Sequence, residues 1–295
     1  MKQLFFAYAA VLLATAPVWA GLEFQTQTSD KQGIVATTHG FVDGAKAKIV
    51  FVSGRSGPGM QKGNYMLSQD GGKNIYLVNP EEKSYMKLNL DQIATQVGQF
   101  MDMAKGFVSM KFSEPKIETL LNERGPTMHG YPTEHIKQRT AYTISTSIFG
   151  QKDTTAMSRE DEIWITKSIK DPGMQIWALQ RSIRTGNKEI DKIIEAEAKK
   201  LNGIPLKTIS VTTTRKGNGQ TDVVTAVNQI TAIKKSRIEP STFAPPQGYR
   251  DATGEVMGEI IKAGQAMQGK SEKAKPGTPQ DSVNTLLKGM FGGRK

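Results

Sequence analysis

The sequence contains no cysteine. The protein therefore forms no disulfide bond, offers no thiol nucleophile and provides no thiolate ligand for a metal ion. A lipid attached through a cysteine is excluded for the same reason. Without covalent cross-links, the core has to be held together by the burial of apolar side chains.

Histidine is also scarce, with three residues in the chain. His129 and His135 flank a Gly-Tyr-Pro segment beside Glu134, and this spacing fits no helical or hairpin pair of metal ligands. The 13 methionines are scattered, which indicates adaptable packing rather than a thioether copper site. We therefore predict no metal site and no cofactor.

Motifs of catalysis are missing as well. The Gly-rich loop from Gly54 to Gly59 departs from the nucleophile-elbow pattern because Pro58 occupies the place of the second glycine. The loop also lacks the Gly-Lys-Ser/Thr ending of a phosphate-binding loop. Glu160 and Glu162 would share one face of a strand, as a pair of catalytic carboxylates could, but no base and nucleophile accompany them. We predict that the protein is not an enzyme, and a hydrolase using these carboxylates is a distant alternative.

The first 20 residues resemble an export signal. Lys2 is followed by an almost wholly apolar run from Leu4 to Pro17, and Val18-Trp19-Ala20 places small residues at the two positions that a signal peptidase reads. The run is too short to span a bilayer comfortably. We predict a signal peptide over residues 1–20, cleaved to leave a soluble periplasmic chain from Gly21, with a retained anchor as the alternative.

The charge is basic, with 39 Lys and Arg against 28 Asp and Glu. The excess is spread along the chain, which suits an anionic membrane surface or anionic glycans and lipids as partners. Nucleic acid is the usual partner of a basic protein, but an exported chain seldom meets it. Simple solubility explains the same charge equally well.

Apolar alternation and turn residues predict a sheet-rich chain with three helices. Residues 65–88 form a meander of short strands joined by Asp70-Gly71-Gly72 and by a turn after Asn79. The other predicted strands are 47–53, 108–112, 117–123, 133–147, 162–166 and a closing hairpin over 205–238 with its turn at Gly217-Asn218-Gly219. The predicted helices begin at Asp91, Pro172 and Asn187 and end before Gly106, Gly186 and Gly203.

The composition changes after Tyr249. Residues 270–280 contain almost no apolar side chain, which is typical of a disordered linker. Two amphipathic pieces flank it, and the second could lie on an anionic membrane or dock on a protein partner. The residues that we expect to make this contact are Leu286, Leu287, Lys288, Met290 and Phe291. Packing of the tail on its own domain is the alternative.

Four segments carry a resemblance to a known class of exported proteins: residues 75–85, Gly130-Tyr131, Glu162-Ile163-Trp164 and residues 243–249. With the order of elements around them, they resemble an uncharacterised family of exported domains, similar in outline to the LolA/LolB-like periplasmic lipoprotein carriers. The resemblance covers about residues 22–249. It implies a curved antiparallel sheet, a half-open β-barrel, wrapped around a few helices and enclosing a cavity that shelters lipid chains. No carrier ligand residue matches one for one, so none is carried over.

These observations predict an α+β fold in three parts: a signal peptide (1–20), a LolA-like half-barrel domain (21–249) and a partly disordered helical tail (250–295). We expect a non-enzymatic protein that binds a lipid, lipoprotein acyl chains or another apolar ligand. The expected cavity wall comprises Phe51, Tyr65, Leu67, Tyr76, Tyr85, Phe100 and Trp164. A core that is simply filled would use the same residue types. The alternative function is an envelope scaffold that acts through its basic tail, and the sequence leaves the oligomeric state open.

Overall fold

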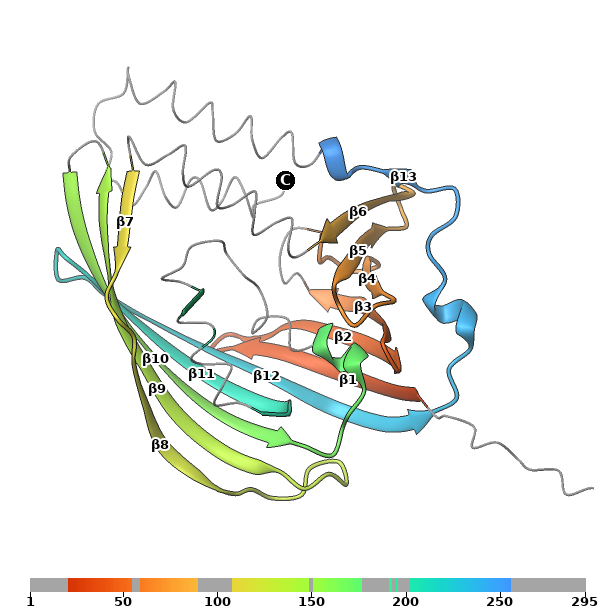
Figure 1. Ribbon diagram of the computed structural model, residues 1–295, viewed down its shortest axis with the longest axis horizontal. Helices are drawn as coiled ribbons and strands as arrows, with labels where there is room; N and C mark the ends of the chain where they lie inside the picture. Colours follow the sequence, from red (N-terminus) through yellow and green to blue (C-terminus); the bar gives the residue numbers. More distant parts are fainter. Residues whose placement is uncertain are drawn as a thin grey trace, which may run out of the picture.

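The computed structural model describes residues 21–54, 59–89, 108–148, 151–176, 191–192, 195 and 202–255. These residues form one large, strongly curved sheet of 13 strands (Figure 1). The first six strands are β1 (Gly21–Asp30), β2 (Gly33–Asp43), β3 (Lys46–Gly54), β4 (Tyr65–Ser68), β5 (Asn74–Asn79) and β6 (Ser84–Asn89). The others are β7 (Val108–Phe112), β8 (Lys116–Arg124), β9 (Glu134–Ile148), β10 (Gln151–Thr166), β11 (Ile204–Lys216), β12 (Thr221–Ser236) and β13 (Arg250–Asp251).

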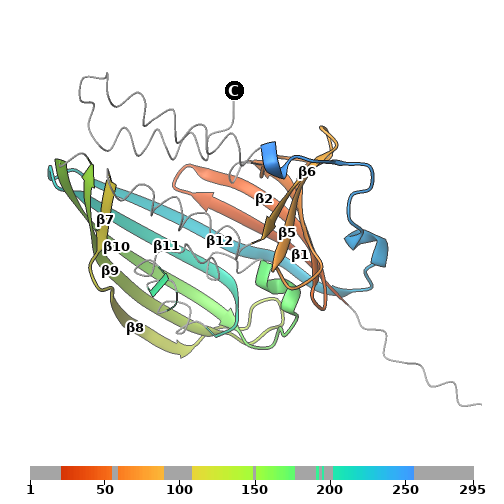
Figure 2. The same cartoon turned by 45° about the horizontal axis from the view of Figure 1, so that its top comes forward.

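The strand order is β13-β6-β5-β4-β3-β2-β1-β12-β11-β10-β9-β7, and β8 also pairs with β9. Neighbours run antiparallel except β13, which pairs in parallel with β6. The last long strand, β12, pairs with β1 on one side and with β11 on the other. It therefore joins the N-terminal strands β1 to β6 to the strands β7 to β11. Figure 2 shows β9 to β12 side by side as one broad surface that continues into β1 and β2.

The two faces of the sheet differ in burial. Side chains alternate between them along each strand, and the register of the pairs shows which residues share a face. We call inner the face that carries Phe24, Ile49 and Ile163, all of which are buried. The outer face carries Glu23 and Trp164 among others, and most of its side chains are half-buried or exposed.

The main apolar core lies on the inner face over β1, β2 and β3. A short 3₁₀ helix, η1 (Pro172–Ile176), packs on β2 and β3 and contributes Met174. The ring of Phe24 covers Gly40 on the neighbouring strand, where even a methyl group would collide with the ring. An aromatic ring over a strand glycine buries backbone that would otherwise be bare. The buried cluster comprises Leu22, Phe24, Val42, Ala47, Ile49, Ile169, Met174, Ile204, Leu206 and Ile230.

The segment after β12 crosses the outside of the β3–β6 meander (Figure 1). It contains a second 3₁₀ helix, η3 (Pro240–Phe243), which contacts β3. Gln69 Nε2 donates a hydrogen bond of 2.8 Å to the Phe243 carbonyl, and the Arg250 amide donates to Lys83 O at 2.8 Å. We call residues 237–253 the strap. It extends past residue 249, because β13 adds Arg250 and Asp251 to the sheet.

The predicted α+β fold class is wrong. Strands make up 66% of the residues that the structure describes and helices 7%, so the described fold is all-β with one open sheet. The helix predicted over residues 91–104 lies outside the described residues. Of the helix expected from Pro172, the described part is the short η1, and of the one expected from Asn187 only Asp191, Lys192 and Glu195 are described, as helical. The sheet dominates because long polar stretches such as residues 151–161 also pair as strands.

Asp70 organises the turn between β4 and β5. Its carboxylate accepts hydrogen bonds from Ser68 Oγ (2.9 Å), the Asn74 amide (3.0 Å) and Asn74 Nδ2 (2.6 Å). Burial opposes ionisation of this carboxyl, but the hydrogen bonds from Asn74 and Ser68 outweigh it and lower the pKa of Asp70 below its ordinary value. The charged form is therefore stabilised in the folded protein.

Replacing Asp70 with alanine is expected to lower the free energy of unfolding by about 1–3 kcal/mol at pH 7, because three donors lose a charged acceptor. A lowered pKa in the folded state gives stability that is present above the unfolded-state pKa of about 4 and is lost as the pH falls through the folded-state value. The difference between wild type and Asp70→Ala should therefore shrink below pH 4. Urea titrations at a series of pH values measure it.

Asp30→Ala is the matched control for the Asp70 experiment. Asp30 also stands at a hairpin turn, but it is exposed and accepts a hydrogen bond of 2.7 Å from the Gln32 amide. Its replacement should change the free energy of unfolding by less than about 1 kcal/mol. Equal losses for the two variants at pH 7, or a loss for Asp70→Ala that does not depend on pH, would contradict the role given to the Asp70 carboxylate.

Candidate functional site: the inner face of β9, β10 and β11

The expected cavity residues of the meander do not share one face of the sheet. Phe51 points to the inner face, where it is buried. Leu67 pairs with Lys48 and Tyr76, and this row belongs to the outer face. Tyr65 and Tyr85 occupy the neighbouring outer row, both paired with Val78.

The strap explains why outer residues of the meander are buried. Leu67 is fully buried although it lies on the outer face. Burial and the nearby Tyr249 of the strap raise the pKa of Tyr65, and the Lys48 ammonium lies 4.4 Å from the centre of the Tyr65 ring. Burial also lowers the pKa of Lys48. This surface is therefore part of a second packing layer between the sheet and the strap.

Trp164 is on the outer face of β10. The His135 ring stacks on it with 4.6 Å between ring centres and 7° between the planes, and the Lys207 ammonium lies 4.9 Å from the ring centre. Phe100 lies outside the described residues, as do all five tail residues from Leu286 to Phe291. The structure thus brings Tyr65, Leu67, Tyr76 and Tyr85 together on the outer face, but it does not join them with Phe51 or Trp164 in one wall.

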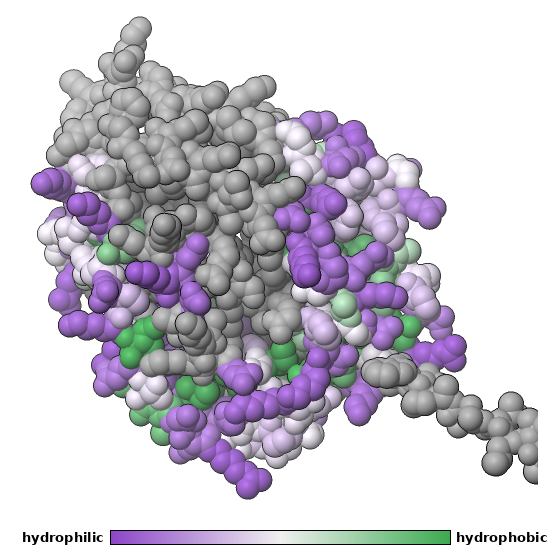
Figure 3. Space-filling view, viewed as in Figure 1, coloured by the Kyte–Doolittle hydropathy of each residue, from purple (hydrophilic) through white to green (hydrophobic). Residues whose placement is uncertain are grey.

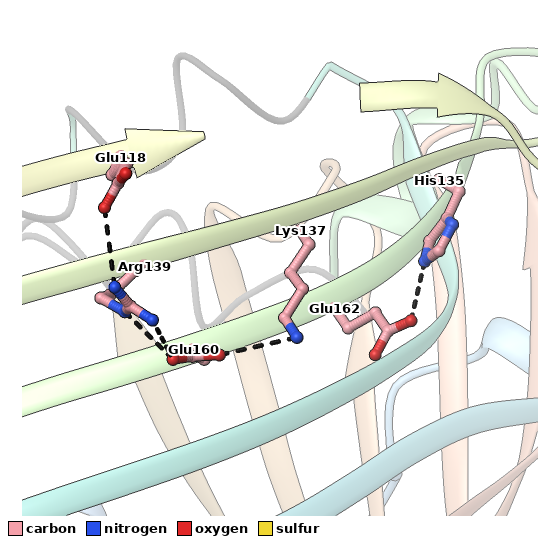
Figure 4. A network of polar contacts seen from close by, with 6 residues as sticks. All are labelled: Glu118, His135, Lys137, Arg139, Glu160 and Glu162. Carbon is pink, nitrogen blue, oxygen red and sulfur yellow. Dashed lines mark hydrogen bonds and ion pairs between the residues drawn. The ribbon is translucent and has the colours of Figure 1, made fainter. Parts of the chain in front are cut away.

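Charged residues on the outer face of β8, β9 and β10 form a ladder of ion pairs (Figure 4). Glu160 accepts hydrogen bonds from Arg139 Nη2 (2.7 Å) and Nε (3.0 Å), and Lys137 Nζ lies 3.6 Å from its other oxygen. The hydrogen bonds from Arg139 lower the pKa of Glu160. Glu162 is paired with His135 Nε2 at 2.8 Å. Both glutamates share one face, as predicted, and their partners suit a cross-strand network rather than proton transfer.

The inner face of β9, β10 and β11 carries two polar rows. Gln138, Asp161 and Ser210 are directly opposite one another on the three strands. Thr140, Arg159 and Thr212 form the next row. Asp161 joins the rows, since its two carboxylate oxygens accept hydrogen bonds from Arg159 Nε at 2.8 Å and from Ser210 Oγ at 2.6 Å.

Two side chains in these rows are buried without hydrogen-bond partners. Gln138 has 0% of its surface exposed and Thr140 has 1%. Gln138 Nε2, Gln138 Oε1 and Thr140 Oγ1 are the three such buried side-chain atoms found in the described part of the chain. A buried polar atom without a partner costs about 1–3 kcal/mol, so native proteins satisfy nearly all of them, with protein, water or ligand. In the folded protein these three atoms carry that cost unless a buried water or another bound group meets them.

Apolar side chains adjoin the orphaned polar atoms. Ile136, Ile163 and Ile165 form a second buried cluster, one row further along the same face. At the other side, the row that contains Thr140 ends on β12 at Val224, which is 62% exposed. On this face, buried apolar residues are followed by buried polar groups, and these are followed by an exposed apolar residue at the edge. We call Ile136, Gln138, Thr140, Asp161 and Ile163 the inner-face site.

The inner-face site is not apparent from the sequence. In residues 134–142, neither set of alternate positions is consistently apolar. The sequence therefore predicts that Gln138 is an ordinary solvated side chain. Only the register of β9 against β10 shows that Gln138 faces Asp161. One signal of this site was available in the sequence: Gln138 lies two residues from both Ile136 and Thr140, in a strand longer than a hairpin requires.

In the described ranges, no group of three or more His, Asp or Glu residues is placed to hold a metal ion. None of the described helices is long and apolar enough to cross a membrane. In the view of Figure 3, the described side chains are mostly hydrophilic, with apolar groups in small separate patches.

These features define a cysteine-free, all-β domain built on a single curved sheet with a polar and apolar inner face. The chain belongs to the family described as "Domain of unknown function (DUF4412)", whose model matches residues 28–249. No curated protein matches the sequence.

Two solved structures are similar to this chain at a low level. The structure of PNGF-II is 13% identical over 79% of this chain, with a TM-score of 0.32, and this chain covers 30% of that protein's length. A "putative lipoprotein" from Parabacteroides distasonis is 12% identical, covers 74% of this chain and 97% of its own, and has a TM-score of 0.26. At these scores the similarity carries no functional conclusion, and it does not confirm a LolA-like fold.

Proposed function

We propose that this protein is a non-enzymatic periplasmic binding protein that holds an amphiphile, a lipid or a similar ligand with a large apolar part, on the inner face of β9, β10 and β11. The observation that supports it is the pair of buried, unpartnered side chains, Gln138 and Thr140, beside the apolar cluster around Ile163. An amphiphile could contact the apolar cluster with its acyl chain and form hydrogen bonds with Gln138 and Thr140 through its head group.

The energetics favour such a ligand. Each methylene group of an acyl chain that is removed from water contributes about 0.8 kcal/mol. Because Ile136, Ile163 and Ile165 are already buried, binding at this cluster requires the fold to open there. Hydrogen bonds from a bound group to Gln138 and Thr140 would offset the cost of burying these side chains. The predicted signal peptide and the resemblance to periplasmic lipoprotein carriers agree with a role in sheltering acyl chains from water.

Equilibrium binding tests the proposal. The mature chain, residues 21–295, is titrated with a monoacylglycerol that carries a fluorophore on its acyl chain, and saturable binding is expected. Ile163→Thr should weaken binding about tenfold, because it removes apolar contact and adds a hydroxyl to the apolar part of the site. Binding is measured by fluorescence anisotropy below the critical micelle concentration.

Val50→Thr serves as the control for Ile163→Thr. Val50 is a half-buried β-branched residue on the outer face of β3, far from the inner-face site in the strand order. Circular dichroism confirms that both variants fold. Wild-type protein that is folded and binds no acyl probe, or equal weakening by the two substitutions, would refute ligand binding at this face.

A further inference from the structure

Tyrosine is concentrated on the outer face of the meander. Four of the seven tyrosines of the chain gather there, one on each of β4, β5 and β6 and one on the strap. All four are half-buried, so part of each side chain remains in contact with solvent. We call this surface the tyrosine face, and its four residues are Tyr65, Tyr76, Tyr85 and Tyr249.

Lys48 provides a positive charge on the tyrosine face. It pairs with Leu67 across β3 and β4, and its ammonium lies 4.4 Å from the centre of the Tyr65 ring. Among the residues that the structure describes, no carboxylate forms an ion pair with Lys48. Its half-burial lowers the pKa of Lys48, so the fold alone opposes the charged form. A ligand that brings a negative charge would stabilise the ammonium.

The Tyr65 hydroxyl supplies a second donor beside this ammonium. Burial raises the pKa of Tyr65 and the neighbouring Tyr249 raises it further, so the hydroxyl keeps its proton at neutral pH. It makes no hydrogen bond with the described part of the chain. An ammonium and a phenol hydroxyl are both donors, and together they suit the oxygen atoms of an anion.

The surrounding charges favour a ligand group with a single negative charge. Lys87 also lies near the tyrosine rings, 5.9 Å from the centre of Tyr76, but it interacts with the Asp251 carboxylate. Lys48 is therefore the lysine of this surface whose charge is left without an acidic partner in the described structure. A carboxylate matches it, whereas a phosphate monoester carries a charge of about −2 at pH 7.

The aromatic rings favour a sugar over an acyl chain. Tyr76 and Tyr85 pack edge to face with 5.6 Å between their ring centres. A phenol ring combines an apolar surface, which can contact the C–H groups of a sugar ring, with a polar tip that can hydrogen-bond sugar hydroxyls. None of the large apolar side chains found exposed in the described ranges lies on the two rows of these tyrosines, so the tyrosine face offers no group for insertion into a bilayer. Those exposed side chains are Ile34, Val52, Val223 and Val224.

We propose that the tyrosine face binds an acidic carbohydrate. A sugar carboxylate, as in a uronic acid, contacts Lys48 and Tyr65, and neighbouring sugar rings of the same chain lie against Tyr76 and Tyr85. This binding goes beyond the proposed function, because the tyrosine face and the inner-face site are on opposite faces of the sheet.

Isothermal titration calorimetry of the mature chain with trigalacturonate tests the proposal. Saturable binding is expected, and the neutral trisaccharide of galactose should bind at least tenfold more weakly because it lacks the carboxylates. Lys48→Met should weaken trigalacturonate binding at least tenfold, since it removes a charged donor. Tyr65→Phe keeps the ring and removes the hydroxyl, and it should weaken binding about fivefold.

Lys116→Met is the matched control, because it removes the same charge from an exposed position on β8, at the other side of the strand order. It should keep the wild-type affinity, and circular dichroism verifies that each variant is folded. Equal weakening by Lys48→Met and Lys116→Met would overturn the proposal in favour of diffuse charge attraction. Equal binding of the neutral and acidic trisaccharides would also overturn it. So would Lys48-dependent binding to phosphatidylglycerol vesicles without binding to trigalacturonate, which would assign this face to a membrane. Each of these results leaves acyl binding at the inner-face site to its own test.

Discussion

Replacing Gln138 with leucine is expected to raise the melting temperature of the protein by about 2–12 °C. The fully buried amide of Gln138 has no hydrogen-bond partner, and an unsatisfied buried group of this kind costs about 1–3 kcal/mol. Leucine has a similar size and no polar atom to desolvate. For a domain of this size, 1 kcal/mol corresponds to roughly 2–4 °C. Differential scanning calorimetry of delipidated protein measures the shift.

Gln25→Leu is the control for the stability experiment, because the same change at an exposed position should alter the free energy of unfolding by less than about 0.5 kcal/mol. A melting temperature for Gln138→Leu that falls by several degrees would contradict the account, since it would mean that the amide makes stabilising hydrogen bonds in the ligand-free protein. Residues kept at a cost to stability are typical of functional sites. The variant should therefore gain stability.

Replacing Phe243 with alanine is expected to lower the free energy of unfolding by about 3–5 kcal/mol, the usual cost of truncating a buried phenylalanine. Phe243 is 1% exposed in η3, and its carbonyl accepts a hydrogen bond from Gln69. Its loss would loosen the strap over the outer face of the meander, where Leu67 is buried. Urea denaturation followed by circular dichroism measures the change.

Phe41→Ala provides the comparison for the strap experiment. Phe41 is a half-buried residue on the outer face of β2, so its truncation should cost clearly less. At a temperature where Phe243→Ala is folded, acyl probe binding should persist, because the strap and the inner-face site lie on opposite faces. A loss of binding without a loss of stability would place the ligand on the outer face of the meander, where Leu67 and the tyrosines of the expected cavity wall lie.

Much of the sheet was predictable from local sequence. The meander strands β4, β5 and β6, the edge strands β7 and β8, and the closing hairpin of β11 and β12 are confirmed within a few residues of the predicted bounds. Each of these segments has apolar alternation or a clear turn, such as Asp70-Gly71-Gly72, at its end. The first part of β10 was missed because residues 151–161 are polar on both faces, and their strand conformation depends on pairing with β9 and β11.

The location of the site could not be predicted in the same way. Which face a residue occupies depends on the register between strands, and irregularities such as the one between Thr37 and Thr38 shift that register. The sequence therefore predicted that the aromatic residues of the meander line a cavity. In the structure, Tyr65, Tyr76 and Tyr85 lie on the outer face, on the side of the strap. Gln138 was overlooked because a single glutamine in a strand carries no sign of burial.

Native mass spectrometry of the mature protein, purified gently from a periplasm and followed by lipid extraction, tests the central claim most directly. The account predicts a stoichiometric adduct whose extracted component is an acyl lipid, and a lower occupancy in Ile163→Thr than in Val50→Thr. A clean mass for the folded protein alone, with no uptake of added monoacylglycerol or fatty acid, would contradict ligand binding on the inner face.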